Sequence, residues 1–212
     1  MGGGAWALLG LAAVFAAGDW IAVATGRKRL EYVCKPLTMV ALLGVALRLQ
    51  PAVSAQRSWW LAALALGLAG DIFLMLPSDR FVAGLAAFLL GHLAYIAGFW
   101  TAGVIPILAV LWFAVLLVPL ASMLRRIIAG ARAAGHAKLV WPVAVYGLVI
   151  TAMVASSFAG HSPLAVGGAA LFAVSDGLIG VRRFVSDRPG MGLAVIVTYH
   201  LGQAALVLSL AR

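Results

Sequence analysis

The stretch Leu68–Phe99, LAGDIFLMLPSDRFVAGLAAFLLGHLAYIAGF, decides the fold, because two apolar runs flank a short polar break. The first run carries a single acid, Asp71, and five apolar residues follow it before Pro77. If this run crosses a bilayer, its carboxyl lies inside the membrane. An ionisable side chain is costly there, so Asp71 marks a candidate functional site.

The composition of the whole chain agrees with a membrane-spanning fold. Of its 212 residues, 65% are hydrophobic and only 10% are charged, whereas soluble domains carry about 25% charged residues. Several apolar runs approach the ~20 residues that a membrane-spanning helix needs. They lack the alternating pattern of a transmembrane barrel, so we predict an all-α polytopic membrane protein.

Charged residues, prolines and glycines separate the apolar runs, and this pattern predicts eight spans within one membrane domain that covers residues 1–212. The spans are 5–24, 36–50, 58–76, 81–100, 104–124, 140–159, 164–182 and 191–211. The second is short for a span unless Val53–Ala55 extend it past Pro51. The first has no basic residues before it, so we interpret it as a retained helix and not as a cleaved signal peptide.

Positive charge alternates between the predicted loops. The loops after spans one, three, five and seven hold twelve of the basic residues: Arg27, Lys28, Arg29, Lys35, Arg80, Arg125, Arg126, Arg132, Lys138, Arg182, Arg183 and Arg188. The other side holds three: Arg48, Arg57 and Arg212. The positive-inside rule then places both termini outside the cytoplasm, and we expect the inner membrane of a bacterium. Because the net charge of +9 lies in short loops, no nucleic-acid partner is expected.

Spans three and four resemble spans seven and eight. Aligning Gly84 with Gly192 places His92 on His200, and Asp71 matches Asp176 if the second loop is three residues longer. This similarity predicts a weak four-plus-four internal repeat with one acid in each half.

With the orientation fixed, most intramembrane polar residues fall at one depth, toward the cytoplasmic side. They are Asp19, Lys35, Asp71, Asp176, Tyr199, His200 and Gln203, with His92 and Tyr95 near mid-membrane on the fourth span. The outer halves of the spans are almost wholly apolar. This asymmetry predicts a cavity that opens to the cytoplasmic leaflet.

The two intramembrane acids are the main catalytic candidates. Burial disfavours a charged carboxylate and a nearby like charge disfavours a second one, so Asp71 and Asp176 would divide into a protonated acid and an ionised base. Two alternatives stay open. The acids could only hold helices together, with Lys35 as one partner, or they could relay protons or ions.

The remaining polar residues are candidates for substrate binding. Lys35 could neutralise either a phosphate or an aspartate, or it could lie at the membrane interface. Tyr95, Tyr199 and Gln203 could bind a polar head group, and His92 and Asp19 lie near the same layer. For each of them, a buried hydrogen bond between helices is the structural alternative.

We expect neither a metal nor a cofactor. There is no HExxH sequence and no pair of histidines at i, i+4 spacing, so zinc has no local scaffold. Cys34 is the only cysteine, which excludes an internal disulfide and a cysteine-based cluster.

Three segments of the chain resemble a known family. GDIFLML followed by LGH and Tyr95, KPL at Lys35–Leu37, and FAVSDGLIG at Phe172–Gly180 are similar to the YhhN family of membrane proteins. The resemblance extends over nearly the whole chain. Asp71 and Asp176 match the two acids of the family, and Lys35, Tyr95 and Tyr199 match weaker polar positions.

The resemblance implies a lysoplasmalogenase, which hydrolyses the vinyl ether bond of lysoplasmalogen to a fatty aldehyde and glycerophosphocholine or glycerophosphoethanolamine. Its substrate would be a lysophospholipid that enters from the bilayer. Protonation of the vinyl ether requires an acid, and capture by water requires a carboxylate, which suits Asp71 and Asp176. The alternative is a transporter or carrier of a small lipid or amphiphile that uses the same aspartates.

Overall fold

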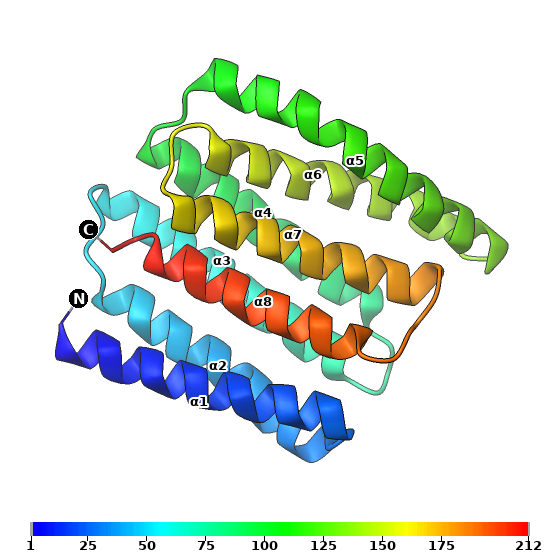
Figure 1. Cartoon of the computed structure of the whole chain (residues 1–212), viewed down its shortest axis with the longest axis horizontal. Coiled ribbons are helices and arrows are strands. Elements are labelled where there is room, and N and C mark those ends of the chain that lie inside the picture. Colours follow the sequence, from blue (N-terminus) through cyan, green and yellow to red (C-terminus); the bar gives the residue numbers. More distant parts are fainter. Residues whose placement is uncertain (1, 212) are drawn as a thin grey trace.

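The chain folds as a bundle of long helices in the computed structural model, which describes residues 2–211 (Figure 1). The helices are α1 (Gly3–Thr25), α2 (Lys28–Arg48), α3 (Ser54–Met75), α4 (Phe81–Ala102), α5 (Pro106–Ala133), α6 (Val140–Phe158), α7 (Pro163–Phe184) and α8 (Met191–Leu208). A short 3-10 turn, η1 (Ala137–Leu139), leads into α6. The structure is 85% helical and has no strand among the described residues.

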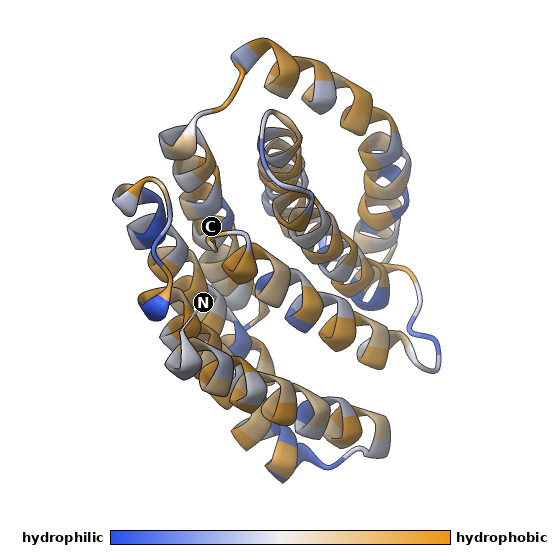
Figure 2. Cartoon of the chain, turned by 60° about the vertical axis from the view of Figure 1, so that its left-hand side comes forward, coloured by the Kyte–Doolittle hydropathy of each residue, from blue (hydrophilic) through white to orange (hydrophobic). Residues whose placement is uncertain are grey.

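Eight helices, counted over residues 2–211, are long and apolar enough to cross a membrane. Hydrophobic residues extend along them, and hydrophilic residues gather mainly near their ends (Figure 2). The predicted all-α fold with eight spans is therefore confirmed, and the protein is an integral membrane protein.

Proline and glycine set several helix boundaries. Pro106 and Pro163 lie in the first turns of α5 and α7, where the missing N–H of proline costs no hydrogen bond. Ser162 caps α7 by accepting a hydrogen bond from the N–H of Ala165. Gly26 ends α1 in the left-handed region at a φ of 69°, a conformation that glycine adopts without strain.

The second helix differs from its predicted range. It begins at Lys28 and contains Pro36, so it gains its length on the polar side and not from residues beyond Pro51. Lys35 consequently lies inside the helix and not at its start. The prediction failed because Pro36 follows a charged segment and was interpreted as a boundary, whereas membrane helices tolerate an internal proline.

Glycines allow the α3–α4 and α7–α8 hairpins to pack closely. A Cβ at position 91 would lie 3.3 Å from the carbonyl oxygen of Ala63 in α3, and one at position 168 would lie 2.9 Å from the carbonyl oxygen of Gly202 in α8. Small residues let membrane helices approach in this way.

Long side chains join the two hairpins to each other. Trp60 of α3 donates a hydrogen bond from Nε1 to the carbonyl oxygen of Leu206 in α8, at 2.7 Å. The rings of Phe88 in α4 and Phe172 in α7 lie 6.1 Å apart. Helices α1 and α2 lie at one edge of the bundle, and α5 and α6 lie at the other (Figure 1). The candidate site forms between the hairpins.

Candidate functional site

Both oxygens of the Asp71 carboxyl have partners, and one of them forms an ion pair. Lys35 Nζ lies 3.1 Å from Asp71 Oδ1, and the Tyr199 hydroxyl donates to Oδ2 at 2.7 Å. The carboxyl is 1% exposed, so its charge is compensated by Lys35 and not by water. Pairing with an aspartate is one of the three roles that the sequence left open for Lys35.

Lys35 also lines a polar cleft at the ends of α1, α2, α7 and α8. The cleft has an empty volume of about 1480 Å³ including its open mouth. Side chains of both charges line it, namely Lys28, Glu31, Arg182, Asp187 and Arg188. Asp71 therefore lies one side chain away from a cleft of aqueous character.

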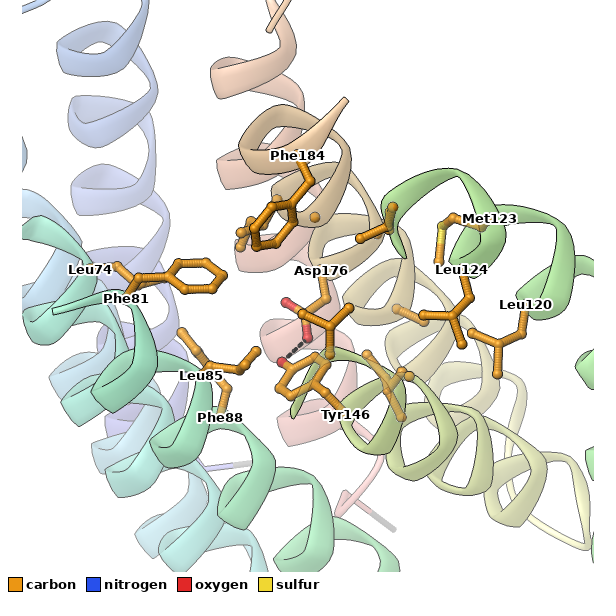
Figure 3. Close-up of a pocket in the computed structure, with 18 residues that line it drawn as sticks. Leu74, Phe81, Leu85, Phe88, Leu120, Met123, Leu124, Tyr146, Asp176 and Phe184 are labelled. Carbon is orange, nitrogen blue, oxygen red and sulfur yellow. Dashed lines mark hydrogen bonds between the residues drawn. The ribbon is translucent and has the colours of Figure 1, made fainter. Parts of the chain in front are cut away.

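Asp176 has different partners. His92 Nε2 lies 2.9 Å from Asp176 Oδ2, and the Tyr146 hydroxyl donates to the same oxygen (Figure 3). That hydroxyl also lies 3.1 Å from His92 Nε2. Neither partner carries a permanent positive charge. The hydrogen bonds of Asp176 to other described residues all involve Oδ2, so Oδ1 is left free.

The Asp176 carboxyl lines an apolar pocket between α4, α5, α6 and α7, with an empty volume of about 660 Å³ including its open side. Leu85 and Phe88 lie on one side of Asp176, and Met123 and Leu124 lie on the other (Figure 3). Asp176 is the only carboxyl among the lining residues. The arrangement presents a single acid to a space that suits hydrocarbon.

An aromatic layer separates the two aspartates. The Phe172 ring lies 4.7 Å from that of His92 and 5.3 Å from that of Tyr199, and Phe88 packs edge to face against Tyr199 at 5.8 Å. The sequence placed both acids at one depth. The structure gives each acid its own partners, with no hydrogen bond between the two carboxyls.

The other predicted residues form two further groups. Tyr95 donates to Gln203 Oε1 at 2.5 Å, and Gln203 lies one helical turn after Tyr199 on α8. Asp19 is fully buried without a hydrogen-bond partner, and its Oδ2 lies 3.9 Å from Nε2 of His200. Tyr95 and Gln203 therefore belong beside the Asp71 site, whereas Asp19 lies with His200.

Tyr146 is the site residue that the sequence analysis did not identify. A tyrosine hydroxyl in an apolar helix needs a hydrogen-bond partner, and this signal was present in the sixth span. Three of the four tyrosines, Tyr95, Tyr146 and Tyr199, bind a carboxyl or amide in this region. Within residues 2–211, no three His, Cys, Asp or Glu residues gather as a metal site would require.

The fold and the two carboxyl sites define a polytopic membrane protein with paired intramembrane acids. The chain belongs to the YhhN family, whose model matches residues 30–210, and this confirms the resemblance seen in the sequence.

Curated relatives carry the name lysoplasmalogenase. The chain is 33% identical over 153 residues to lysoplasmalogenase TMEM86B of Homo sapiens, covering 71% of this chain and 62% of the human protein. It is 30% identical over 191 residues to the lysoplasmalogenase of Mycobacterium bovis, covering 82% and 68% of the two chains. The matched region thus spans about two thirds of the length of these relatives. No solved structure matches the chain.

Proposed function

We propose that this protein hydrolyses the vinyl ether bond of a lysoplasmalogen, releasing a fatty aldehyde and glycerophosphocholine or glycerophosphoethanolamine. Family membership and the names of the relatives support this proposal, and they do not favour a transporter. The observation that carries it is Asp176, whose free Oδ1 faces an apolar cavity while Oδ2 is held by Tyr146 and His92.

In this proposal Asp176 is the general acid. Tyr146 and His92 both bind Oδ2, so Oδ1 is the atom that carries and delivers the proton. The electrons of the double bond form a bond from the β-carbon to this proton, and a lone pair of the ether oxygen moves toward the adjacent carbon. The product is an oxocarbenium ion beside the Asp176 carboxylate that has just formed, which stabilises the positive charge.

Asp71 is the base that activates water. Lys35 is the counter-ion of this carboxyl, and the polar cleft beside Lys35 supplies water. The water oxygen bonds to the oxocarbenium carbon and its proton passes to the carboxylate. The resulting hemiacetal loses its hydroxyl proton, its C–O bond to glycerol breaks, and the glycerol oxygen is protonated. The rings of Phe88 and Phe172 lie between the two carboxyls, so this step requires them to move.

Most of the remaining polar residues hold the two acids in place in this proposal. Tyr199 and Lys35 fix Asp71, and His92 fixes Asp176. Tyr95 and Gln203 bind each other beside Tyr199 and so support the Asp71 site, and Asp19 lies with His200. Both termini lie outside the cytoplasm of a bacterial inner membrane, as the distribution of basic residues predicts.

This function is tested by measuring the release of aldehyde from lysoplasmalogen by the purified protein in detergent. The wild type should release aldehyde, and Asp71→Asn and Asp176→Asn should each lower kcat by more than about 10²-fold, as expected for loss of an acid or base. Folding of each variant is checked by size-exclusion chromatography. A folded but inactive wild type would reject the substrate assignment, and a fully active Asp176→Asn variant would reject the mechanism.

A further inference from the structure

Three neighbouring pockets, which share lining residues, lie between the cytoplasmic end of the bundle and Asp176. An outer cleft of about 950 Å³ lies between α5 and the end of α7. An apolar groove of about 990 Å³ follows between α5, α6 and α7, and the Asp176 cavity lies beyond it. The cleft and the groove share Pro119, Met123 and Val181. The groove and the cavity share Leu120, Met123, Ile150, Ala173 and Gly177.

Met123 is the one residue that lines all three spaces. It packs over Gly177, the residue after Asp176, so closely that a Cβ at position 177 would lie 2.9 Å from Met123 Sδ. Methionine is unbranched and adapts readily to different packing. Its side chain can therefore move aside without displacing a helix.

Helix α5 is loosely held, which suits an opening beside it. Only four of its 28 residues, Ala109, Leu120, Ile127 and Ala131, are buried. Val110 and Val118 are 63% and 73% exposed, so this helix presents hydrocarbon to the lipid. A close contact with α7 occurs at Gly130, where a Cβ would collide with the carbonyl oxygen of Phe184.

The outer cleft carries two cationic side chains that are not paired. Arg182 and Arg183 bind Asp187 and Asp79, whereas Arg126 and Arg188 have no carboxylate within salt-bridge distance among the described residues. Ser122 and Ser186 add hydroxyls to the same cleft. Guanidinium groups and hydroxyls form the kind of site that recognises a phosphate diester.

We propose that a single-chain phospholipid enters laterally between α5 and α7, with its phosphate bound by Arg126 and Arg188, its chain in the apolar groove, and Met123 as the side chain that closes the path to Asp176. The proposal rests on the proposed function and adds the route and the head-group site. The neighbouring pockets share lining residues and are polar at the interface and apolar within, which is the order of groups in a lysophospholipid.

Kinetics with matched arginine variants tests the head-group site. Arg126→Gln should raise KM for lysoplasmalogen about tenfold with kcat retained, as expected for loss of a charge-assisted hydrogen bond. Arg125→Gln is the control, because Arg125 is also exposed on α5 but donates to its own helix at the carbonyl oxygen of Ala121. An unchanged KM in Arg126→Gln, or an equal rise in both variants, would overturn the phosphate site.

Photo-crosslinking tests the route without relying on activity. A lysophosphatidylcholine with a diazirine in its chain should label α5 and α7 around Met123 and Ala173, and Met123→Trp should reduce this labelling about tenfold. Labelling confined to α1, α2 or α8 would overturn the route even if the enzyme is active. Labelling of α5 and α7 in a protein that releases no aldehyde would uphold the route and reject the function.

A soluble competitor distinguishes a site that binds the whole lipid from a site that binds only its phosphate group. Glycerophosphocholine carries the same head group without the chain, so it should protect weakly against labelling compared with unlabelled lysophosphatidylcholine. Equal protection by both compounds would show an anion site that does not select a lipid, and this would also overturn the proposal.

Discussion

The Asp71 and Asp176 sites contain the same acid in different surroundings. Asp71 has both oxygens bound, pairs with the cation Lys35 and lies beside a polar cleft. Asp176 has one free oxygen, binds a tyrosine and a histidine and faces hydrocarbon. The difference suits a reaction between a lipid and water, because each aspartate lies on the side from which one of the two reactants would come.

The partners of the two acids follow one scheme. Each aspartate binds a residue from the second helix of its own half, which is Lys35 of α2 or Tyr146 of α6. Each also binds a residue from the last helix of the other half, which is Tyr199 of α8 or His92 of α4. The predicted alignment places His92 on His200 and not on Tyr199, so the four-plus-four repeat stays a prediction. Within that scheme, the chemical identity of the partners makes the two sites different.

Chemical rescue gives the largest contrast between the two acids. Asp176→Gly and Asp71→Gly should each lower kcat by about 10² to 10⁴-fold, the range expected for an acid or base. Acetate added at high concentration should restore part of the activity of Asp176→Gly, because the deleted carboxyl faces an open cavity. It should not restore Asp71→Gly, whose carboxyl is enclosed by Lys35 and Tyr199. Rescue of both variants to the same degree would show that the two sites are equally accessible.

Measurements of unfolding should show a larger loss of stability from a change at Asp71 than from the same change at Asp176. Asp71→Asn leaves the Lys35 ammonium without its buried partner, and breaking such a pair costs about 3 to 5 kcal/mol of unfolding free energy. Asp176→Asn alters hydrogen bonds to two groups without permanent charge and should cost about 1 to 3 kcal/mol.

Thermal melts in detergent compare the two variants. Lys35→Met combined with Asp71→Leu serves as the control, since it removes both charges and should recover most of the lost stability while remaining inactive. A smaller loss for Asp71→Asn than for Asp176→Asn would contradict the assigned ion pair.

Each aspartate accepts a hydrogen bond from one tyrosine, so removing that hydroxyl tests the comparison at the level of a single hydrogen bond. Tyr146→Phe removes a donor from Asp176 Oδ2 and should lower kcat about tenfold, as expected for a hydrogen bond to a charged group. Tyr199→Phe should have less effect on kcat because Lys35 still holds Asp71. Steady-state kinetics with KM reported separately distinguishes the two variants. A greater loss of kcat in Tyr199→Phe would assign the acid to Asp71.

The sequence predicted the spans because apolar length and loop charge are local properties. It identified Asp71 and Asp176 because an acid in an apolar run is conspicuous. It left open that Lys35 pairs with an aspartate but did not say which one, and it did not predict that His92 binds Asp176, since these contacts depend on how helices far apart in the chain pack. The start of α2 was wrong because Pro36 lies inside a helix whose first residues are polar.

Two surface ion pairs at the end of α7 lie beside the two sites and should have the smallest effects. Arg183 binds Asp79 and lies over the ring of Phe81, which lines the Asp176 cavity, and Arg182 binds Asp187 in the polar cleft. Exposed pairs of this kind contribute little to stability. Hydrogen bonds from Arg182 hold the pKa of Asp187 below its ordinary value.

The Asp187 pair therefore makes a specific prediction about pH. A group whose pKa is lowered on folding stabilises the protein above its unfolded pKa, near about 4, and loses this contribution as the pH falls through the folded value. Asp187→Asn should thus melt slightly below the wild type at pH 7, and the difference should disappear as the pH falls below that range. A difference in melting temperature that persists in acid would mean that Asp187 stabilises the polar cleft through packing and not only through its charge.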